Sequence, residues 1–280
     1  MLRNFNKMLH TAYKAGYAVG AFNVYNYETM KGAVQAAAHS GRPVILAFGA
    51  GYLSHMSFAS AVSMARALDE ENNVELCLHL DHCTELNKVF EAIGAGFNSV
   101  MYDGSLLPFK ENMQNTKLVC KVAHVYDVSV EAELGRMSAS ENSFEGNAGG
   151  REIFTSAREA GEFTAESGCD ALAVSIGAVH GTYDGEPDIR IDILKEINAA
   201  AGIPLVLHGG SGISEPTIRE CIKNGISKIN INTEISANAV ERTKALLGAE
   251  KLPHLAAIAE TQAGCIRETV GKYINLFMPS

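Results

Sequence analysis

The chain is short of basic residues, with 23 Lys and Arg against 32 Asp and Glu among 280 residues. Its formal net charge of −9 at pH 7 argues against a broad nucleic-acid footprint, because neutralising phosphates requires clustered Lys and Arg. A local anion site remains open to it, since backbone N–H groups can build one without basic side chains. The charge therefore predicts no nucleic-acid partner and leaves a local anion site possible.

Long apolar runs are also missing. No run approaches the roughly 18 residues that a membrane span requires. The opening MLRNFNKMLHTAYKAG lacks the continuous apolar segment of a signal peptide. The six cysteines contain no CxxC pair and several lie in apolar runs, a pattern typical of reduced, intracellular proteins. Together these absences predict a cytoplasmic protein with no membrane partner.

The chain does contain a regular alternation of short apolar runs and amphipathic stretches. The runs that read as strands lie near 16–24, 43–48, 74–80, 99–103, 128–134, 171–177, 204–209 and 228–233. One helix is expected to begin after Ser214 as N-cap, with Pro216 in its first turn, and to end at Gly225. Eight such units over about 250 residues predict a (β/α)8 TIM barrel, with extra C-terminal helices near 253–277.

A doubly wound open sheet is the main rival architecture. It usually carries a GxGxxG turn after its first strand, and that turn is absent here. We see no linker or low-complexity segment, so residues 1–280 are expected to form a single domain.

Titratable side chains concentrate at the C-terminal ends of the predicted strands, the face on which such barrels carry function. His82, His180 and His208 end strands three, six and seven. Three histidines with one open position are the arrangement of a catalytic zinc. A lone strand-end histidine is more often only hydrogen-bonded, but three at one barrel mouth favour a metal site. Asp81, beside His82, would exchange protons with an oxygen near the metal, or alternatively orient a histidine.

Further polar residues end neighbouring strands. Asp103 and Glu133 would serve as ligands of an alternative metal position or as hydrogen-bonding partners of the ligands. His79 lies within the body of its strand, where a core-facing or supporting histidine is expected.

The run LHGGSGI (207–213) predicts a phosphate site. Its glycines let the backbone approach a ligand and Ser211 adds a hydroxyl. Barrels often bind phosphate with the loops after strands seven and eight, and strand eight supplies Asn230, Asn232 and Thr233 beside this run.

In this order, HLDH, SVMYDGS, VSVEAELG, LAVSIGAVHGTY, PLVLHGGSGI and KININTE resemble the class II, zinc-dependent ketose-phosphate aldolases, which include fructose- and tagatose-bisphosphate aldolases. The resemblance extends from FNVYN (22–26) to about residue 235. It implies a lyase of carbohydrate metabolism that reversibly cleaves a ketose 1,6-bisphosphate or ketose 1-phosphate into dihydroxyacetone phosphate and an aldehyde.

The resemblance also implies roles for individual residues. His82, His180 and His208 would bind Zn²⁺, Asp81 would be the proton donor, and Asp103 and Glu133 would match an alternative metal position. The residues implied to bind substrate, with a monovalent cation (Na⁺ or K⁺) near the phosphate, are Asn23, Gly181, Gly209, Ser211, Asn230, Asn232 and Thr233. Family members are commonly homodimers or homotetramers.

The chemistry of aldol cleavage fits a metal site. Cleavage leaves negative charge on an enediolate, which Zn²⁺ would stabilise as a Lewis acid. The metal-free route needs a Schiff-base lysine inside the barrel. No predicted strand has a lysine near its C-terminal end, and Lys228 lies at the opposite end of strand eight. A lysine mechanism is therefore disfavoured.

Three segments depart from the family pattern. The usual GGxED after strand five is replaced by SASEN (138–142), in which Glu141 takes the position of the acid and is expected to be the base. Asp184 stands where many fructose-bisphosphate enzymes have lysine, and the terminal NLFMPS lacks a Gly-rich, basic tail. These changes fall where the far end of the substrate would bind. The aldehyde is therefore expected to be glyceraldehyde 3-phosphate, or an unphosphorylated or acidic aldehyde.

Two other functions stay open. A zinc hydrolase on the same barrel would usually place an HxH pair at the end of strand one, where this chain has FNVYN. A catalytically silent homologue retained for binding is the other alternative. The presence of all the expected metal-binding residues argues against it.

Overall fold

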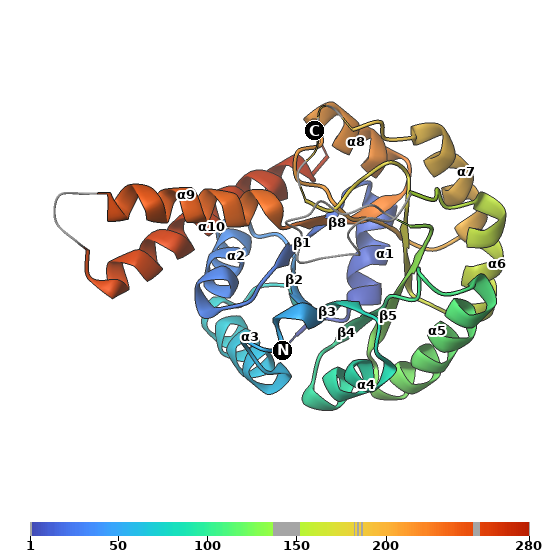
Figure 1. Cartoon of the computed structure of the whole chain (residues 1–280), viewed down its shortest axis with the longest axis horizontal. Coiled ribbons are helices and arrows are strands. Elements are labelled where there is room, and N and C mark those ends of the chain that lie inside the picture. The colour runs from blue at the N-terminus through green and yellow to red at the C-terminus, as the bar shows by residue number, and fades with distance from the viewer. Residues whose placement is uncertain are drawn as a thin grey trace.

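The computed structural model describes residues 2–136, 152–181, 183, 185, 187–248 and 253–279. Parallel strands close into a barrel in chain order, from β1 to β8 and back to β1 (Figure 1). They are β1 (Val19–Asn23), β2 (Val44–Gly49), β3 (Leu76–Cys83), β4 (Ser99–Tyr102), β5 (Ser129–Leu134), β6 (Ala171–Val174), β7 (Leu205–Leu207) and β8 (Ile226–Ile231). The predicted (β/α)8 barrel is confirmed. Strand β8 ends earlier than expected, so that Thr233 is the first residue of a helix and no longer part of the strand.

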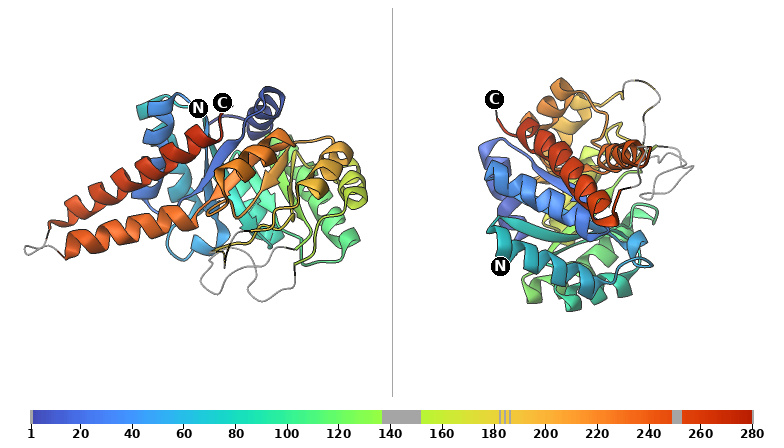
Figure 2. Two further views of the ribbon diagram at one scale, coloured as in Figure 1. Left: turned by 90° about the horizontal axis from the view of Figure 1, so that it is seen from above. Right: turned by 90° about the vertical axis from the view of Figure 1, so that its left-hand side faces the viewer.

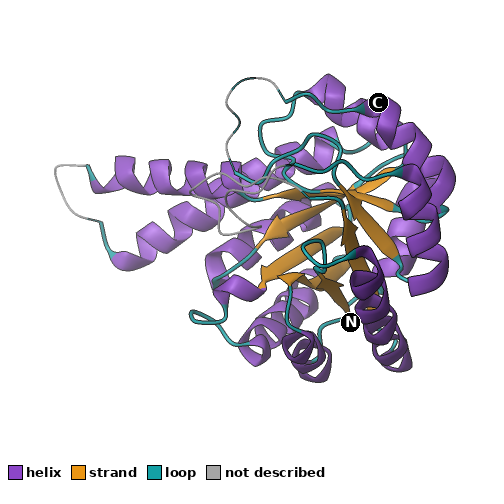
Figure 3. Cartoon of the chain, turned by 45° about the vertical axis from the view of Figure 1, so that its right-hand side comes forward, coloured by secondary structure: helices purple, strands orange, loops and turns teal. Residues whose placement is uncertain are grey.

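Helices surround the strands (Figure 3). They are α1 (Phe5–Ala15), α2 (Tyr27–Ser40), α3 (Phe58–Asn72), α4 (Leu86–Ala95), α5 (Phe109–Ala123), α6 (Ala157–Ser167), α7 (Ile191–Ala201), α8 (Glu215–Lys223), α9 (Thr233–Leu247) and α10 (Leu255–Leu276), with short 3-10 turns η1 (Ala50–Tyr52) and η2 (His124–Tyr126). None of the described helices combines the length and apolar character that crossing a bilayer requires.

Local signals explain several helix boundaries. The N-cap of α2 is Asn26, whose side chain accepts from the Thr29 backbone N–H in a capping box. The expected start of α8 at Ser214 is confirmed, although its hydroxyl meets that of Thr217 at 2.9 Å and caps no backbone group. Gly225 follows this helix with a φ of 108°, a conformation that favours glycine.

Two separate apolar cores fix the barrel. The larger lies between the strands and the surrounding helices. The smaller fills the lower barrel interior, where Phe5, Leu9 and Ala12 of α1 pack on Ile45 and other inward-facing strand residues. Helix α1 thereby closes the N-terminal end of the barrel and leaves the C-terminal end as the open mouth.

The expected C-terminal helices form an arm. Helices α9 and α10 run side by side and project beyond the ring of helices (Figures 1 and 2). The base of α10 packs along α2, where a Cβ on Gly32 would lie 2.7 Å from the Ile266 side chain. Glycine at this position allows the two helices to approach closely. Because α9 starts at the end of β8, the arm is rooted at the barrel mouth.

Candidate functional site

Three histidines meet at the barrel mouth, from β3 and from the segments after β6 and β7. The ring centroid of His82 lies 4.7 Å from that of His180 and 4.5 Å from that of His208. One ring nitrogen of each lies within 4.8 Å of those of the others. Within the described part of the chain, Nε2 of His82, both nitrogens of His180 and Nδ1 of His208 are buried without a hydrogen-bond partner. Buried polar atoms are normally paired, so this cluster fits a bound metal ion.

The backbone at the end of β3 is unusual. His82 has a φ of 42°, in the left-handed region that a non-glycine residue adopts at a cost. The pairing of β3 with β4 shifts register between Leu80 and Cys83, so the strand turns at this point. Such strain is typical of functional sites, and here it accompanies the delivery of Asp81 and His82 to the same mouth.

Carboxylates border the cluster. Asp103 Oδ2 lies 3.3 Å from His82 Nδ1, and Glu133 Oε2 lies 3.5 Å from His208 Nδ1. His82, Asp103 and Glu133 also form a second group whose ligand atoms lie within 4.8 Å of one another. The structure thus brings the five predicted metal-binding residues together. This geometry is compatible both with an alternative metal position and with a supporting role for the two carboxylates.

Electrostatics in this pocket favour a cation. Burial lowers the pKa of His82, but the carboxylates of Asp81 and Asp103 outweigh it and raise the value to about 10. Burial, then the charges of His82 and His208, hold the pKa of His180 well below its ordinary value. In the ion-free protein a proton on His82 balances the acidic groups. A metal ion would replace that proton, because histidine ligates only as the neutral imidazole.

Asp81 is fully buried and held from both sides. Its Oδ2 accepts a hydrogen bond from Asn23 Nδ2 at 3.0 Å and its Oδ1 accepts one from Asn230 Nδ2 at 3.1 Å. Burial raises the pKa of the Asp81 carboxyl, but the charges of His82 and Lys228 outweigh it and hold that pKa well below the usual range. The two asparagines, expected to bind substrate, therefore fix an ionised carboxylate in this structure.

Sequence reasoning missed a buried ion pair beneath the histidines. Lys228 Nζ lies 3.0 and 2.9 Å from the two carboxylate oxygens of Glu131, and both side chains are fully buried. Glu131 Oε1 also lies 3.0 Å from His208 Nε2. When His208 is neutral, an ionised Glu131 that accepts from Nε2–H leaves Nδ1 as the unprotonated nitrogen. Glu131 thereby selects the nitrogen of His208 that faces the other histidines.

His79 belongs to the same buried layer. Its Nε2 lies 3.6 Å from Glu131 Oε2, its Nδ1 lies 2.8 Å from Ser99 Oγ, and its ring stacks on Phe5. Burial, followed by the charge of Lys228, lowers the pKa of His79 to about 3, so the ring is neutral. His79 is thus both core-facing and a neighbour of the ion pair. The signal that could have revealed this layer is the alternation of polar residues along β5 and β8.

The loops after β6 and β7 are tied together. The Tyr183 hydroxyl accepts from the Val179 N–H at 3.2 Å and donates to the Gly209 carbonyl at 2.8 Å. Gly209 has a φ of 65°, and a Cβ there would lie 2.2 Å from the Val179 carbonyl oxygen. Only glycine fits so close to the neighbouring loop. Gly181, in the first of these loops, also has a positive φ, of 106°.

An amide-rich corner lies beside these loops. Ser211 Oγ accepts from the Glu234 N–H at 3.4 Å, which places the loop against the first turn of α9. The N-cap residue of α9, Asn232, makes no side-chain cap hydrogen bond, and its Nδ2 instead donates to the Tyr52 hydroxyl at 3.4 Å. The start of a helix beside a glycine-rich loop is a suitable anion site. Glu141 and Asp184 lie outside the described residues.

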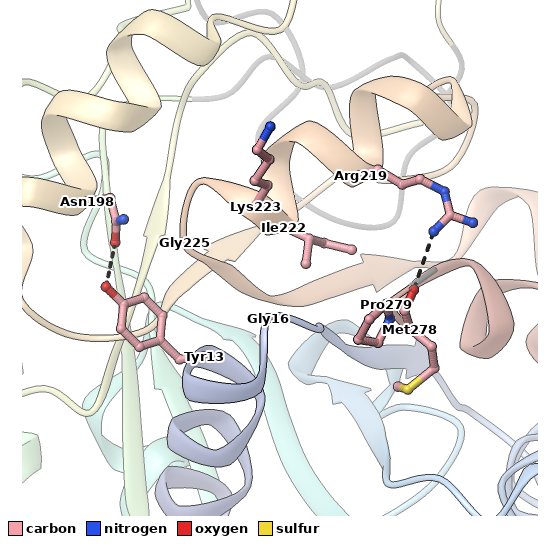
Figure 4. Close-up of a pocket in the computed structure, with 9 residues that line it drawn as sticks. All are labelled: Tyr13, Gly16, Asn198, Arg219, Ile222, Lys223, Gly225, Met278 and Pro279. Atoms are coloured by element: carbon pink, nitrogen blue, oxygen red, sulfur yellow. Dashed lines mark hydrogen bonds between the residues drawn. The ribbon is translucent and has the colours of Figure 1, made fainter.

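The opposite end of the barrel carries a different hollow, of about 530 Å³ (Figure 4). There the Tyr13 hydroxyl donates to Asn198 Oδ1 at 3.1 Å, and Arg219 donates to the Met278 carbonyl at 3.3 Å. The described residues that line it include no histidine and no carboxylate, the groups that a metal or acid–base site needs. The candidate site is therefore at the mouth.

Known proteins resemble this chain over nearly its whole length. The family model described as fructose-bisphosphate aldolase class-II matches residues 3–280. The probable fructose-bisphosphate aldolase of Bacillus subtilis (strain 168) is 41% identical over 281 residues, which cover 95% of this chain and 97% of the relative.

Solved structures agree with this match. The YdjI aldolase from Escherichia coli K12 superposes with a TM-score of 0.86 at 31% identity, covering 99% of this chain and 97% of its own. A putative fructose-1,6-biphosphate aldolase from Coccidioides immitis gives a TM-score of 0.90 at 25% identity, covering 98% and 96%. The chain therefore belongs to the class II fructose-bisphosphate aldolase family and is an aldolase.

Proposed function

We propose that the protein is a Zn²⁺-dependent aldolase. It would reversibly cleave a ketose 1,6-bisphosphate or ketose 1-phosphate into dihydroxyacetone phosphate and an aldehyde. The observation that carries the proposal is the buried cluster of His82, His180 and His208, whose unpaired nitrogens lie beside an ionised Asp81. Three imidazoles in one buried group suit zinc better than the oxygen-seeking cations Mg²⁺ and Ca²⁺.

In this proposal His82, His180 and His208 hold the metal. Bound Zn²⁺ would supply Lewis-acid stabilisation of the negative charge that develops on the ketose oxygens during cleavage. Asp103 and Glu133 either support the ligands or offer the alternative position, since each lies within 4 Å of a ligand nitrogen. Glu131 orients His208 from below.

Asp81 would carry the proton transfer at C4. In cleavage its carboxylate takes the proton of the C4 hydroxyl while the C3–C4 bond breaks and its electron pair stays on C3. In condensation the same carboxyl returns the proton to the aldehyde oxygen. Asn23 and Asn230 hold the carboxylate in place at 3.0 and 3.1 Å, and the charges of His82 and Lys228 keep it ionised. Glu141 is proposed to deliver the proton that C3 needs to become dihydroxyacetone phosphate.

The phosphate of the dihydroxyacetone half is proposed to bind at the corner between the β6 and β7 loops and the start of α9. Gly181 and Gly209 belong to these loops, Ser211 accepts from the Glu234 N–H of α9, and Thr233 is the first residue of that helix. The positive end of the helix dipole at the start of α9 would attract negative charge. Asn232, the N-cap residue of α9, is proposed to contribute to the same site. From the family resemblance we further propose a monovalent cation near the phosphate, a homodimeric or homotetrameric assembly, one domain over residues 1–280, and a cytoplasmic location.

A coupled assay for dihydroxyacetone phosphate release tests the proposal, run over hexulose 1-phosphates and 1,6-bisphosphates with EDTA and with zinc added back. We expect EDTA to abolish release and zinc to restore it. His208→Ala should lose bound zinc, measured directly by metal analysis. His124→Ala should keep it, because His124 pairs with Asp170 away from the mouth. Release that persists in EDTA would refute the zinc mechanism.

Two outcomes would favour the other candidate functions. Zinc-dependent consumption of water across an ester or amide, with no triose phosphate formed, would indicate a hydrolase. Zinc bound by the three histidines without turnover of any ketose phosphate would indicate a silent homologue. The position where hydrolases usually carry an HxH pair holds Asn23, which hydrogen-bonds Asp81. That contact supports the aldolase.

A further inference from the structure

A cavity of about 430 Å³ lies at the edge of the barrel mouth, under the base of the arm. It is bounded by the loop into α2, by η1 and by the facing sides of α9 and α10. The lining residues that carry the argument are Tyr25, Glu28, Tyr52, His55, Asn232 and Gln262. Of the residues assigned to the phosphate of the dihydroxyacetone half, Asn232 alone is among the described residues that line this cavity.

The cavity lies beyond the ends of strands that neighbour Asp81 in the barrel. Tyr52 follows β2, whose last residue Gly49 pairs with Asp81 in the barrel. Asn230 holds Asp81, and Asn232 lies two residues farther toward the mouth. The cavity lining thus continues β2 and β8, two strands whose residues pair with or hold Asp81.

The lining suits an uncharged, hydroxyl-bearing chain. The rings of Tyr25 and Tyr52, 5.0 Å apart, offer apolar faces to C–H groups and hydroxyls at their edges. The amides of Asn232 and Gln262 and the imidazole of His55 can both donate to and accept from sugar hydroxyls. Such mixed surfaces bind polyols without needing a counter-charge.

The same lining is poorly suited to a phosphate. Among the described residues around the cavity there is no Lys or Arg, and the one carboxylate is that of Glu28. A phosphate placed here would lose hydration without gaining a cationic partner and would face a like charge. The lining therefore favours an uncharged, hydroxyl-bearing chain over a chain that carries a phosphate.

We propose that this cavity binds the aldehyde half of the substrate as an uncharged polyhydroxylated chain, so that the enzyme prefers ketose 1-phosphates to ketose 1,6-bisphosphates. The inference rests on the aldol cleavage proposed above and specifies its substrate class.

The test compares kcat/KM for release of dihydroxyacetone phosphate from each hexulose 1-phosphate and its own 1,6-bisphosphate, so that stereochemistry is matched within a pair. We expect a preference of about tenfold or more for the monophosphate of the best pair, because the second phosphate is left unpaired. Gln262→Leu should raise KM for the monophosphate severalfold with little change in kcat, since Gln262 lies away from the reacting atoms.

Charge reversal in the cavity provides the sharper measurement. Glu28→Lys should raise kcat/KM for the bisphosphate, which would reduce or reverse the preference for the monophosphate. Glu70→Lys makes the same charge change on the exposed side of α3 and should leave the ratio unchanged. A bisphosphate preference in the native enzyme, or equal effects of the two variants, overturns this inference and leaves the aldolase intact. Absence of release from every ketose phosphate removes the proposed function and this inference with it.

Discussion

Replacing Lys228 by methionine should destabilise the protein strongly, although Lys228 touches no solvent. Its ammonium lies 2.9–3.0 Å from both oxygens of Glu131, and both side chains are fully buried. Methionine keeps the length and removes the charge. Glu131 would then be a buried carboxylate whose described neighbours are His208 Nε2, at 3.0 Å, and the neutral His79, at 3.6 Å.

The magnitude follows from that uncompensated charge. Removing one partner of a buried ion pair costs about 3–5 kcal/mol, a large part of the roughly 5–15 kcal/mol that stabilises a typical domain. Burial raises the pKa of Glu131, and Lys228 outweighs it and lowers that pKa to about 2. Without Lys228 the pKa rises, and uptake of a proton by Glu131 limits the cost. Adding Glu131→Gln removes the stranded charge, so the double variant should be more stable than Lys228→Met alone.

Urea unfolding in EDTA measures these differences free of any contribution from bound metal. Lys117→Met is the matched control, because Lys117 pairs with Glu166 at 3.3 Å on an exposed surface. The control should change the free energy of unfolding by no more than about 1 kcal/mol. Zinc affinity, measured by chelator competition, should fall about 10- to 100-fold in Lys228→Met, because a protonated Glu131 is a weaker acceptor for the Nε2–H of His208.

A cost below about 1 kcal/mol for Lys228→Met would refute the reasoning, as would a double variant less stable than the single one. Should Lys228→Met fail to fold, the double variant and Lys228→Arg still decide the matter. Arginine keeps the charge and should retain more of the zinc affinity than methionine does.

Three further changes test other parts of the site. Gly209→Ala should cost at least about 2 kcal/mol in urea unfolding and markedly lower kcat/KM, because its Cβ would lie 2.2 Å from the Val179 carbonyl oxygen; native-like stability would contradict so close an approach of the two loops. Tyr183→Phe loses one hydrogen bond within the β6 loop and one between the two loops, so the thermal midpoint should fall by a few degrees and KM should rise, whereas an unchanged KM would separate this tie from substrate binding. The pKa of His79 is about 3 in the folded protein and about 6.5 in the unfolded chain, so in that window only the unfolded chain binds the proton and stability falls as pH falls. In EDTA, the free energy of unfolding of the native protein should therefore fall as the pH drops from 6.5 to 5. In His79→Gln this fall should be smaller by up to about 1.4 kcal/mol per pH unit, and equal slopes would count against a neutral His79.

The barrel and the gathering of its histidines were accessible from sequence for a simple reason. Apolar runs mark parallel strands, and the C-terminal ends of such strands meet at one mouth, so His82, His180 and His208 had to be neighbours. The sequence does not predict which ring nitrogen each histidine turns toward the other two. That orientation depends on neighbours such as Glu131, and on the left-handed turn at His82.

Lys228 shows a second limit. Counting along the predicted strand placed Lys228 at the end opposite the mouth, but β8 begins at Ile226, so Lys228 lies within the strand and pairs with Val206 in the middle of β7. Its contact with Glu131 crosses the barrel from β8 to β5, and such contacts depend on the tilt and stagger of all the strands. A two-residue period identifies inward-facing positions within one strand but gives no register between distant strands.

Helix α1 strengthens the charge interactions beneath the barrel mouth by keeping water out of the barrel interior. Its Phe5 ring lies 5.2 Å from the ring of His79 and nearly parallel to it, and with Leu9 it forms a dry floor under the ion pair. Water there would weaken every charge interaction severalfold, since Coulomb energies scale inversely with the dielectric constant. By excluding it, a helix that contributes no ligand lets a lysine one layer below the histidines act on Asp81 and His208 above it. Helix α1, the first helix of the chain, thereby keeps the dielectric constant low around the buried charges that act on the site.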